Sequence, residues 1–395
     1  MTTPAPTAGR GTAAHTTGPR GSDASGGPGG SCASGDSGGP ALDDRLDAAV
    51  HAVEAPHVVF AASVGGRRAI RSGGTAPPPA VERARLRYEA GSASKPYTGL
   101  LLAALTLDGT VGRGTPALAC LAPGAAVPDD PVTLLHLVTH TSRLPALPRD
   151  FYRQALPRWS TNPFAGYPAA HVVDAFVRRE TARTGRRVRR RPGTRWHYSN
   201  FGVSVLGHAL AAATRTPWET LLHERILAPL ALSGTALTPA PPPDFSDAGP
   251  ARAGDAADAV GHRADGVTPV PPLRIGGFAP AGGVRTTPAD ALTFLEAHLH
   301  PERTPLAEAL HAVRAPLLRR GLGHRHTHTL TWFQHPTEHG PAYFHCGATS
   351  GQQTFLGFCP GTDVAVAAHT TRRYHRTDPF LPTAYTLLLG PDPLS

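Results

Sequence analysis

The chain has 395 residues, of which 40% are hydrophobic and 17% are charged, and its formal net charge is +9. This apolar content is sufficient for the core of one large domain or two smaller ones, and no apolar run is long enough to cross a bilayer. The basic residues are mostly dispersed, so we expect neither a nucleic-acid nor a membrane partner. The four cysteines form no Cys-x-x-Cys pair, which argues against a disulfide framework or a structural metal.

Residues 1–40 are mostly small and polar, which predicts a disordered Gly/Ser-rich tail in front of a folded domain over 41–395. The tail contains Gly-Asp-Ser-Gly-Gly-Pro at 35–40, a string typical of the reactive serine of chymotrypsin-like proteases. We reject this interpretation because that fold places its histidine and aspartate before the serine. The tail has no basic patch followed by an apolar stretch, so we expect a cytoplasmic protein.

Periodicity and turn signals predict the elements in chain order. Helices are expected over 42–53, 92–107, 132–139, 201–214, 218–230, 287–300 and 379–389. Strands are expected over 57–64, 67–72, 329–333, 342–346, 354–359 and 364–369, and a long surface excursion over 239–272. Strands at both ends and helices between them predict an α/β (α+β) fold, a mainly antiparallel sheet flanked by helices with an all-helical insert at roughly 110–280.

The 38 basic residues include one lysine, Lys95, and 37 arginines. A chain that uses arginine as its general cation retains lysine where arginine cannot replace it. Arginine stays protonated in proteins, whereas a buried lysine loses its proton more readily and can act as a base. The alternative is that Lys95 survives by chance, and its neighbours decide between the two.

Ser92 and Lys95 form a Ser-x-x-Lys pattern at the start of the helix expected over 92–107. Residues three apart share a helix face, so the two side chains are within reach of each other. A helix N-terminus favours the developing negative charge, and a lysine that shares its proton makes the serine a nucleophile. The alternative is an N-cap serine beside a surface lysine; the absence of any other lysine favours the catalytic interpretation.

Tyr198 and Asn200 lie in a Tyr-Ser-Asn segment before the helix expected over 201–214. A tyrosine beside a lysine can act as a phenolate base and then as an acid toward the leaving group. An asparagine amide can orient both the lysine and a substrate carbonyl. The alternative is that Tyr198 is a packed aromatic residue.

A His-Cys-Gly-Ala segment on an expected strand contributes His345, Gly347 and Ala348. The histidine can face a cleft, and the glycine lets a substrate approach the backbone. The N–H groups of Ala348 and Ser92 are candidates for an oxyanion hole.

In their order, Gly-Ser-x-Ser-Lys, Tyr-Ser-Asn and His-x-Gly resemble the motifs of the serine β-lactamase-related family, which includes class C β-lactamases, DD-peptidases, esterases and transacylases. Further similar segments lie at 97–100, 134–142 and 280–284, and the resemblance covers roughly residues 45–390. It implies a β-lactamase/transpeptidase-like fold and an enzyme with no cofactor and no metal.

The resemblance also implies a role for each matching residue. Ser92 becomes the nucleophile, Lys95 and Tyr198 transfer protons, and Asn200 orients the substrate. His345 stands where class C β-lactamases have the lysine of Lys-Thr-Gly, and that departure argues against β-lactamase activity.

Two further positions depart from the family pattern. Cys346 replaces the usual threonine, and we reject it as a rival nucleophile because Ser92 has the better set of partners. Arg143 stands where relatives usually have a glycine.

The function implied is acyl transfer through an acyl-enzyme: an intracellular esterase or transacylase acting on a small-molecule ester or amide, in natural-product biosynthesis. Its partners would be an acyl donor and an amine or alcohol acceptor, and the oligomeric state stays open. One alternative is an exported DD-peptidase or class C-type β-lactamase. An alternative of another class is a catalytically silent binding module on the same fold.

Two clusters of basic residues have no place in this chemistry. Arginines crowd the segment 186–191, which we interpret as a solvated loop, with anion docking as the alternative. His324, His326 and His328 alternate along the chain, and we interpret them as a solvated strand entrance in preference to a metal site.

Overall fold

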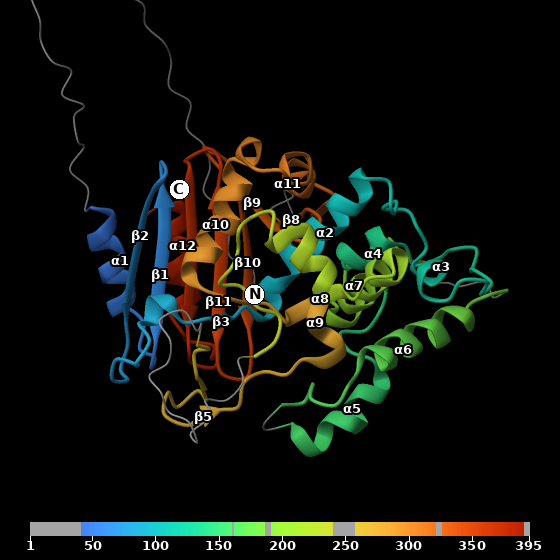
Figure 1. Cartoon of the computed structure of the whole chain (residues 1–395), viewed down its shortest axis with the longest axis horizontal. Coiled ribbons are helices and arrows are strands. Elements are labelled where there is room, and N and C mark those ends of the chain that lie inside the picture. The colour runs from blue at the N-terminus through green and yellow to red at the C-terminus, as the bar shows by residue number, and fades with distance from the viewer. Residues whose placement is uncertain (1–40, 160–161, 186–190, 240–256, 321–325, 391–395) are drawn as a thin grey trace, which may run out of the picture. The chain divides into compact units, whose positions relative to one another are not determined.

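An eight-stranded sheet forms the centre of the protein, in the order β2-β1-β12-β11-β10-β9-β8-β7 (Figure 1). Its strands are β1 (Val58–Val64), β2 (Arg67–Gly73), β7 (Leu318–Arg320), β8 (His326–His328), β9 (Phe333–Thr337), β10 (Gly340–Ala348), β11 (Gln353–Cys359) and β12 (Val364–Thr370). Every neighbouring pair is antiparallel. The pairing of β1 with β12 confirms a mainly antiparallel sheet that the C-terminal segment completes.

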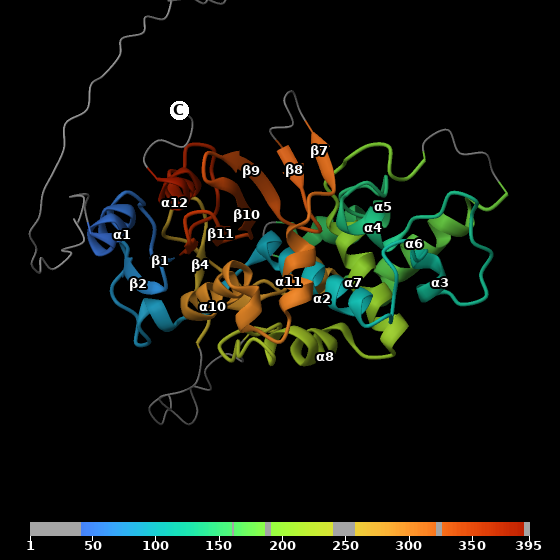
Figure 2. The same cartoon turned by 90° about the horizontal axis from the view of Figure 1, so that it is seen from above.

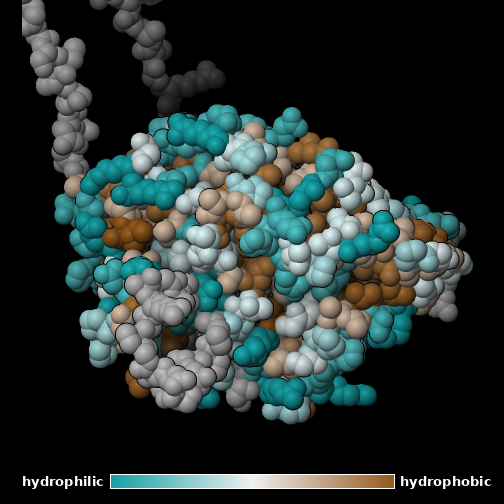
Figure 3. Space-filling view, viewed as in Figure 1, coloured by the Kyte–Doolittle hydropathy of each residue, from teal (hydrophilic) through white to brown (hydrophobic). Residues whose placement is uncertain are grey.

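The computed structural model describes residues 41–159, 162–185, 191–239, 257–320 and 326–390. The tail over 1–40, with its Gly-Asp-Ser-Gly-Gly-Pro string, and the arginines at 186–190 lie outside the described residues. Residues 40–395 form one compact unit. None of the helices in the described ranges is long and apolar enough to cross a membrane. Hydrophilic and hydrophobic side chains are interspersed over the described part of the face in Figure 3.

Helices cover both faces of the sheet, because the side chains of each strand alternate between two apolar layers. Along β1, Phe60 and Ala62 pack with α1 (Leu42–His51) and α12 (Phe380–Leu389). Ala61 belongs to the larger core on the opposite face, to which α2 (Lys95–Leu107) and α10 (Pro288–Leu299) contribute. Figure 2 shows α12 and α10 on opposite sides of the strands. The β1–β2 turn has positive φ at Gly65 and Gly66, as a tight hairpin requires.

Between β2 and β7, the described chain adds no strand to the large sheet. Besides α2 and α10, its helices are α3 (Ala117–Leu121), α4 (Leu134–Val138), α5 (Arg149–Ala155), α6 (Ala169–Thr181), α7 (Asn200–Thr214), α8 (Trp218–Leu222), α9 (Ala279–Gly282) and α11 (Ala307–Arg314). Two small antiparallel pairs join β3 (Tyr88–Glu89) to β6 (Arg285–Thr286), and β4 (Gly261–His262) to β5 (Pro269–Val270). The β4–β5 pair lies in the segment 239–272 that we expected to be a long surface excursion.

The strand expected over 329–333 is wrong. Strand β8 ends at His328 and strand β9 begins at Phe333, and residues 329–332 between them form a turn. The Thr329 side chain accepts a hydrogen bond from the Trp332 backbone N–H, and the two backbones also pair at 3.0 Å. Leu330 and Trp332 are fully buried in the larger core. The apolar residues that suggested a strand are therefore the buried residues of a turn.

Candidate active site

The backbone turns sharply just before Ser92. A short 3₁₀ segment over Gly91–Ser94 precedes α2, and Gly91 has φ +49°, a conformation that favours glycine. A side chain on Gly91 would also meet the backbone of Ala348 at 2.9 Å. Glycine here therefore lets the chain turn while the end of β10 lies directly beside the start of α2.

Gly347 makes a second close approach between β10 and this segment. A Cβ on Gly347 would stand 1.8 Å from the carbonyl oxygen of Ala90. The contact brings Ala348 to the same rim of the pocket as Ser92, and both residues line it. The backbones of the two expected oxyanion-hole residues are thus neighbours, and their role stays a prediction.

Lys95 is completely buried under Ser92. Its Nζ donates to Ser92 Oγ at 3.0 Å and to the Ala281 carbonyl oxygen at 2.9 Å. Burial in a low-dielectric environment disfavours the charged amine and lowers the pKa of Lys95 to about 7. A large fraction of the amine is therefore neutral at neutral pH, and its lone pair lies next to the Ser92 hydroxyl.

The ring of Tyr198 lies beside the Lys95 amine. The Lys95 Nζ is 4.9 Å from the centre of the Tyr198 ring. Burial raises the pKa of Tyr198, and an interaction with the Ser92 side chain opposes the shift only in part. The phenol is thus protonated in the resting site, whereas the sequence interpretation began with a phenolate base.

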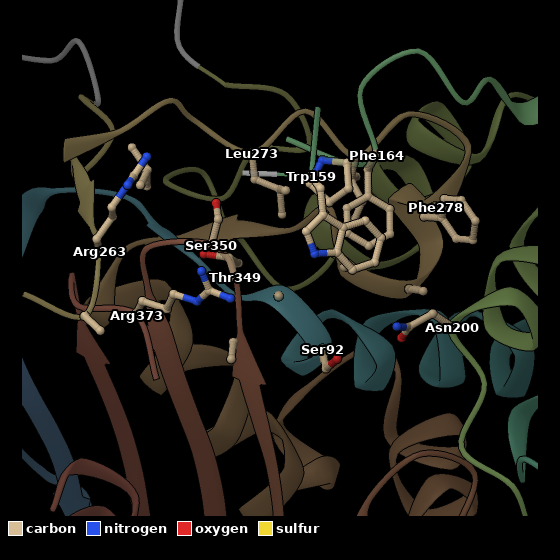
Figure 4. A pocket seen from close by; sticks show the side chains of 18 of the residues that line it. Ser92, Trp159, Phe164, Asn200, Arg263, Leu273, Phe278, Thr349, Ser350 and Arg373 are labelled. Atoms are coloured by element: carbon tan, nitrogen blue, oxygen red, sulfur yellow. The ribbon is translucent and has the colours of Figure 1, made fainter. Parts of the chain in front are cut away.

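Asn200 lines the pocket, whereas His345 is buried behind the pocket wall. Asn200, the first residue of α7, faces the pocket beside Ser92 (Figure 4). Among the described residues, the Lys95 amine donates hydrogen bonds to Ser92 and Ala281 and none to Asn200. The Asn200 amide faces the pocket instead. His345 is 1% exposed and lies behind the pocket wall. Burial and the nearby Lys95 charge lower the pKa of His345 to about 3, so its ring is neutral.

Cys346 points away from this group. Its side chain packs against the apolar layer on the α12 face of the sheet. Burial raises the pKa of the Cys346 thiol to about 12, which leaves almost no thiolate at neutral pH. This environment agrees with our rejection of Cys346 as the nucleophile.

The pocket at Ser92 has a volume of about 570 Å³ and two chemically different sides (Figure 4). Aromatic and aliphatic residues form one side: Trp159, Phe164, Leu273, Ile275 and Phe278. Polar residues form the other side: Arg263, Asp265, Thr349, Ser350 and Arg373. The pocket therefore fits a ligand with an apolar group on one side of the reacting carbonyl and a polar or anionic group on the other.

Sequence reasoning missed these lining residues. One arginine among 37 carries no functional signal, and Trp159 and Phe278 look like ordinary core residues. It also missed the contact of His140 with Tyr198, whose ring centres are 4.5 Å apart. The available signal was the similarity of the 134–142 segment to the family.

Two sets of contacts hold the start of α2 in place. The similar segment over 280–284 is tied to it, because Thr98 Oγ1 donates to the Pro280 carbonyl at 2.7 Å and Ser94 Oγ accepts the Val284 N–H at 3.0 Å. The second set lies at β3, just before α2 in the chain. There the buried Arg285 forms ion pairs with Glu89 at 3.0 Å and with Asp258 at 3.2 Å. These contacts fix the pairing of β3 with β6.

The described residues contain no group of three or more His, Cys, Asp or Glu side chains that could hold a metal ion. His324 lies outside the described residues. His328 is 4% exposed, and its ring lies 5.3 Å from Trp196 and 4.6 Å from Phe333. Our expectation of a solvated strand entrance is therefore wrong at His328, because aromatic residues enclose its ring.

Known proteins share the sequence and the fold of the chain that carries Ser92, Lys95 and Tyr198. The Beta-lactamase family profile matches residues 42–389. The chain belongs to the Beta-lactamase family. As a member of this family, the protein is an enzyme.

Curated relatives share part of the sequence. The D-alanyl-D-alanine-carboxypeptidase/endopeptidase AmpH of Escherichia coli K12 is 33% identical over 182 residues, 45% of this chain and 44% of AmpH. The chain thus aligns with less than half of AmpH. Penicillin-binding protein 4 of Amycolatopsis lactamdurans is 27% identical over 72% of this chain and 71% of its own length.

Solved structures share the fold. A class C β-lactamase superposes with a TM-score of 0.68 at 18% identity, covering 88% of this chain and 95% of the other. The D-alanine carboxypeptidase AmpC of Burkholderia cenocepacia gives 0.65 at 22% identity, covering 87% and 98%. A D-stereospecific amidohydrolase of Streptomyces sp. gives 0.65 at 19% identity, covering 88% and 97%. This Beta-lactamase family member therefore has the mixed α/β fold of class C β-lactamases.

Proposed function

We propose that this enzyme transfers an acyl group from a small-molecule ester or amide through an acyl-enzyme on Ser92, to water or to an amine or alcohol. The observation that carries the proposal is the buried Lys95 amine, with a pKa of about 7, 3.0 Å from the Ser92 hydroxyl at the rim of a pocket. A binding module has no need of an expensive buried amine at this point.

Acylation follows from the protonation states. The neutral Lys95 amine takes the proton of Ser92 as Oγ bonds to the substrate carbonyl carbon. The N–H groups of Ser92 and Ala348 stabilise the oxyanion. The bond to the leaving group then breaks, the protonated Tyr198 donates its proton to that group, and the Lys95 ammonium returns a proton to Tyr198.

Deacylation reverses these transfers. Water or an acceptor attacks the Ser92 ester, its proton passes through Tyr198 and Lys95, and Ser92 leaves with a proton. Asn200, which faces the pocket beside Ser92, orients the carbonyl. The neutral, buried His345 shapes the wall behind Lys95 and supplies no positive charge to the substrate.

The pocket favours an acyl donor with an aromatic or branched apolar acyl group. Such a group would pack against Trp159, Phe164 and Phe278. The esterase or transacylase assignment is supported by this apolar side and by the absence of a lysine at the His345 position. The cytoplasmic, biosynthetic setting expected from the sequence remains part of the proposal.

The second candidate is a DD-peptidase or class C-type β-lactamase. It is favoured by Arg263 and Arg373 on the polar side of the pocket, since guanidinium groups bind carboxylates, and by the carboxypeptidases and β-lactamases among the relatives.

A substrate panel separates these functions. We expect p-nitrophenyl phenylacetate to be turned over faster than p-nitrophenyl acetate, and nitrocefin and a D-Ala-D-Ala peptide to be poor substrates. Adding amines or alcohols should give a new amide or ester with saturable kinetics and proportionally less hydrolysis, because a bound acceptor outcompetes water at ~55 M only through a high effective concentration. If every acceptor leaves hydrolysis unchanged, the enzyme is a plain hydrolase. Efficient nitrocefin or peptide cleavage would establish the second candidate instead.

A further inference from the structure

A second pocket, of about 1100 Å³, lies outside the Ser92 site. The loop after α4, helices α5 and α6, and the segment before α7 contribute its walls; α5 and α6 are seen at the lower right of Figure 1. Its ionisable lining residues are Arg143, Arg149, Asp150, Arg178, Arg179, Glu180, Arg183, Arg195 and His197. Six arginines thus face two carboxylates around one concave surface.

Both carboxylates already have partners. Glu180 is 1% exposed and accepts two hydrogen bonds from Arg183 Nη1, both at 2.7 Å. Asp150 lies 3.6 Å from the Arg178 guanidinium and accepts from the Tyr167 hydroxyl at 3.0 Å. Each carboxylate thus has its ion pair with one arginine, Glu180 with Arg183 and Asp150 with Arg178.

The other four arginines outnumber the carboxylates and form no ion pair among the described residues. In the described part of the chain, no carboxylate lies within ion-pair distance of Arg143, Arg149 or Arg195, and Arg179 Nη2 donates a hydrogen bond to the Arg143 backbone carbonyl at 3.3 Å. Partial desolvation lowers the pKa of Arg179; the negative charge of Glu180 opposes this shift, and the positive charges of Arg183 and Arg149 add to it. Like charges gathered in a concave wall produce a strong positive potential.

Arg143 lines the pocket, and its backbone has an unfavourable conformation. Its φ is +65°, in the left-handed region that non-glycine residues rarely adopt. Glycine would adopt this conformation without strain, but this chain has an arginine here, and Arg143 lines the pocket.

We propose that this second pocket binds a polyphosphate group, through the guanidinium groups of Arg143, Arg149, Arg179 and Arg195. Arginine forks match phosphate oxygens in pairs, and several forks around one hollow suit a ligand with several adjacent negative charges. A flat acidic protein surface would leave the interior of the hollow unfilled.

The pocket and the Ser92 site share one segment. His197 lines the second pocket, whereas Tyr198 and Asn200 lie at Ser92. The His197 backbone N–H donates to the His140 carbonyl at 2.8 Å, so the segment is fixed against the residues that contact Tyr198. The ligand is therefore bound on the opposite side of this segment from the reacting serine.

Calorimetry with inorganic tripolyphosphate at about 50 mM salt tests the proposal, because a charge-driven site is strongest at low ionic strength. We expect one site per chain. Arg143→Gly, which also removes the strained φ, and Arg195→Gln, at an exposed position, should each weaken binding at least about ten-fold. A parallel titration with ATP identifies the source of the phosphates: tighter binding than tripolyphosphate indicates a nucleotide, and equal binding indicates a free polyphosphate.

Matched arginine variants control for general charge. Arg303→Gln changes an arginine 71% exposed outside the pocket, and Arg373→Gln changes one in the Ser92 pocket. Both should bind tripolyphosphate within about two-fold of the unmodified protein. Circular dichroism establishes that each variant is folded. Undetectable binding, equal losses in all four variants, or loss only in Arg373→Gln would overturn the proposal.

Discussion

At the scale of single residues, the reactivity of Ser92 depends on the protonation state of Lys95. The amine is fully buried, bonded to Ser92, and has a pKa of about 7. A lysine in water would be almost entirely charged at neutral pH, with no lone pair for the serine proton. Burial thus converts an ordinary cation into a base near neutral pH.

The first prediction concerns the pH dependence of acylation. The single-turnover acylation rate should rise with pH, reach half of its plateau near pH 7, and level off above, because only the neutral amine accepts the Ser92 proton. In Lys95→Arg the rate should fall about 10²-fold or more and the inflection should disappear, since a guanidinium stays protonated. A near-normal rate in folded Lys95→Arg would show that Lys95 acts only as a cation.

The second prediction concerns Tyr198, whose raised pKa makes it a donor to the leaving group. Tyr198→Phe should slow alkyl esters and amides by about 10²-fold or more, because their leaving groups need a proton. Aryl esters such as p-nitrophenyl esters, which leave as stable anions, should be affected much less. Equal losses for both substrate classes would contradict the assignment of Tyr198 as acid.

At the scale of elements, the site is made by the approach of β10 to the start of α2. The carbonyl of Ala90 occupies the space that a side chain at 347 would need. Contacts from the 280–284 segment hold α2 from the other side. The geometry of Ser92 therefore depends on three segments that are far apart in the sequence.

The third prediction tests this approach. Gly347→Ala would place Cβ 1.8 Å from the Ala90 oxygen, so β10 or the segment before α2 has to move. We expect kcat/KM to fall about 10²-fold with a loss of roughly 1–3 kcal/mol in stability. Gly114→Ala, where a Cβ would meet nothing within 4 Å, is the matched control and should be neutral. Unchanged activity in Gly347→Ala would show that the close contact is not required.

The elements also show what sequence patterns predict. The hairpin, the C-terminal strands and α2 follow from alternation, glycine turns and helical spacing over continuous stretches. Strand signals at 329–333 fail because Thr329 closes a turn whose Leu330 and Trp332 are buried. Ser92 and Lys95 are predictable because their chemistry is local, whereas the pocket walls come together only through the tertiary fold.

At the scale of the whole molecule, the buried amine is a cost to folding. Unfolding returns Lys95 to water and to its ordinary pKa of 10.5. Between about pH 7 and 10.5 the unfolded chain therefore binds more protons at this residue than the folded protein, so the Lys95 contribution to stability improves as pH rises. The enzyme carries its largest penalty below pH 7, where the folded protein holds a buried charge.

The fourth prediction follows from this linkage. Measured relative to the unmodified protein, Lys95→Met should be more favourable to stability at pH 6 than at pH 10 by about 4 kcal/mol, since methionine has no charge to bury. Urea unfolding of both proteins at each pH measures this, and the difference between them cancels the titration of the groups that do not interact with Lys95. A difference that is independent of pH would mean that Lys95 is not desolvated.

The central claim is that Ser92 is the nucleophile and Lys95 its base, and covalent labelling tests it most directly. The protein and its Lys95→Arg variant are treated with a fluorophosphonate at pH 8, and the adduct is located by peptide mass spectrometry. We expect one adduct, on Ser92, that forms about 10²-fold more slowly in the variant. An adduct on Ser37 or Cys346, or equally fast labelling of Ser92 in both proteins, would contradict it.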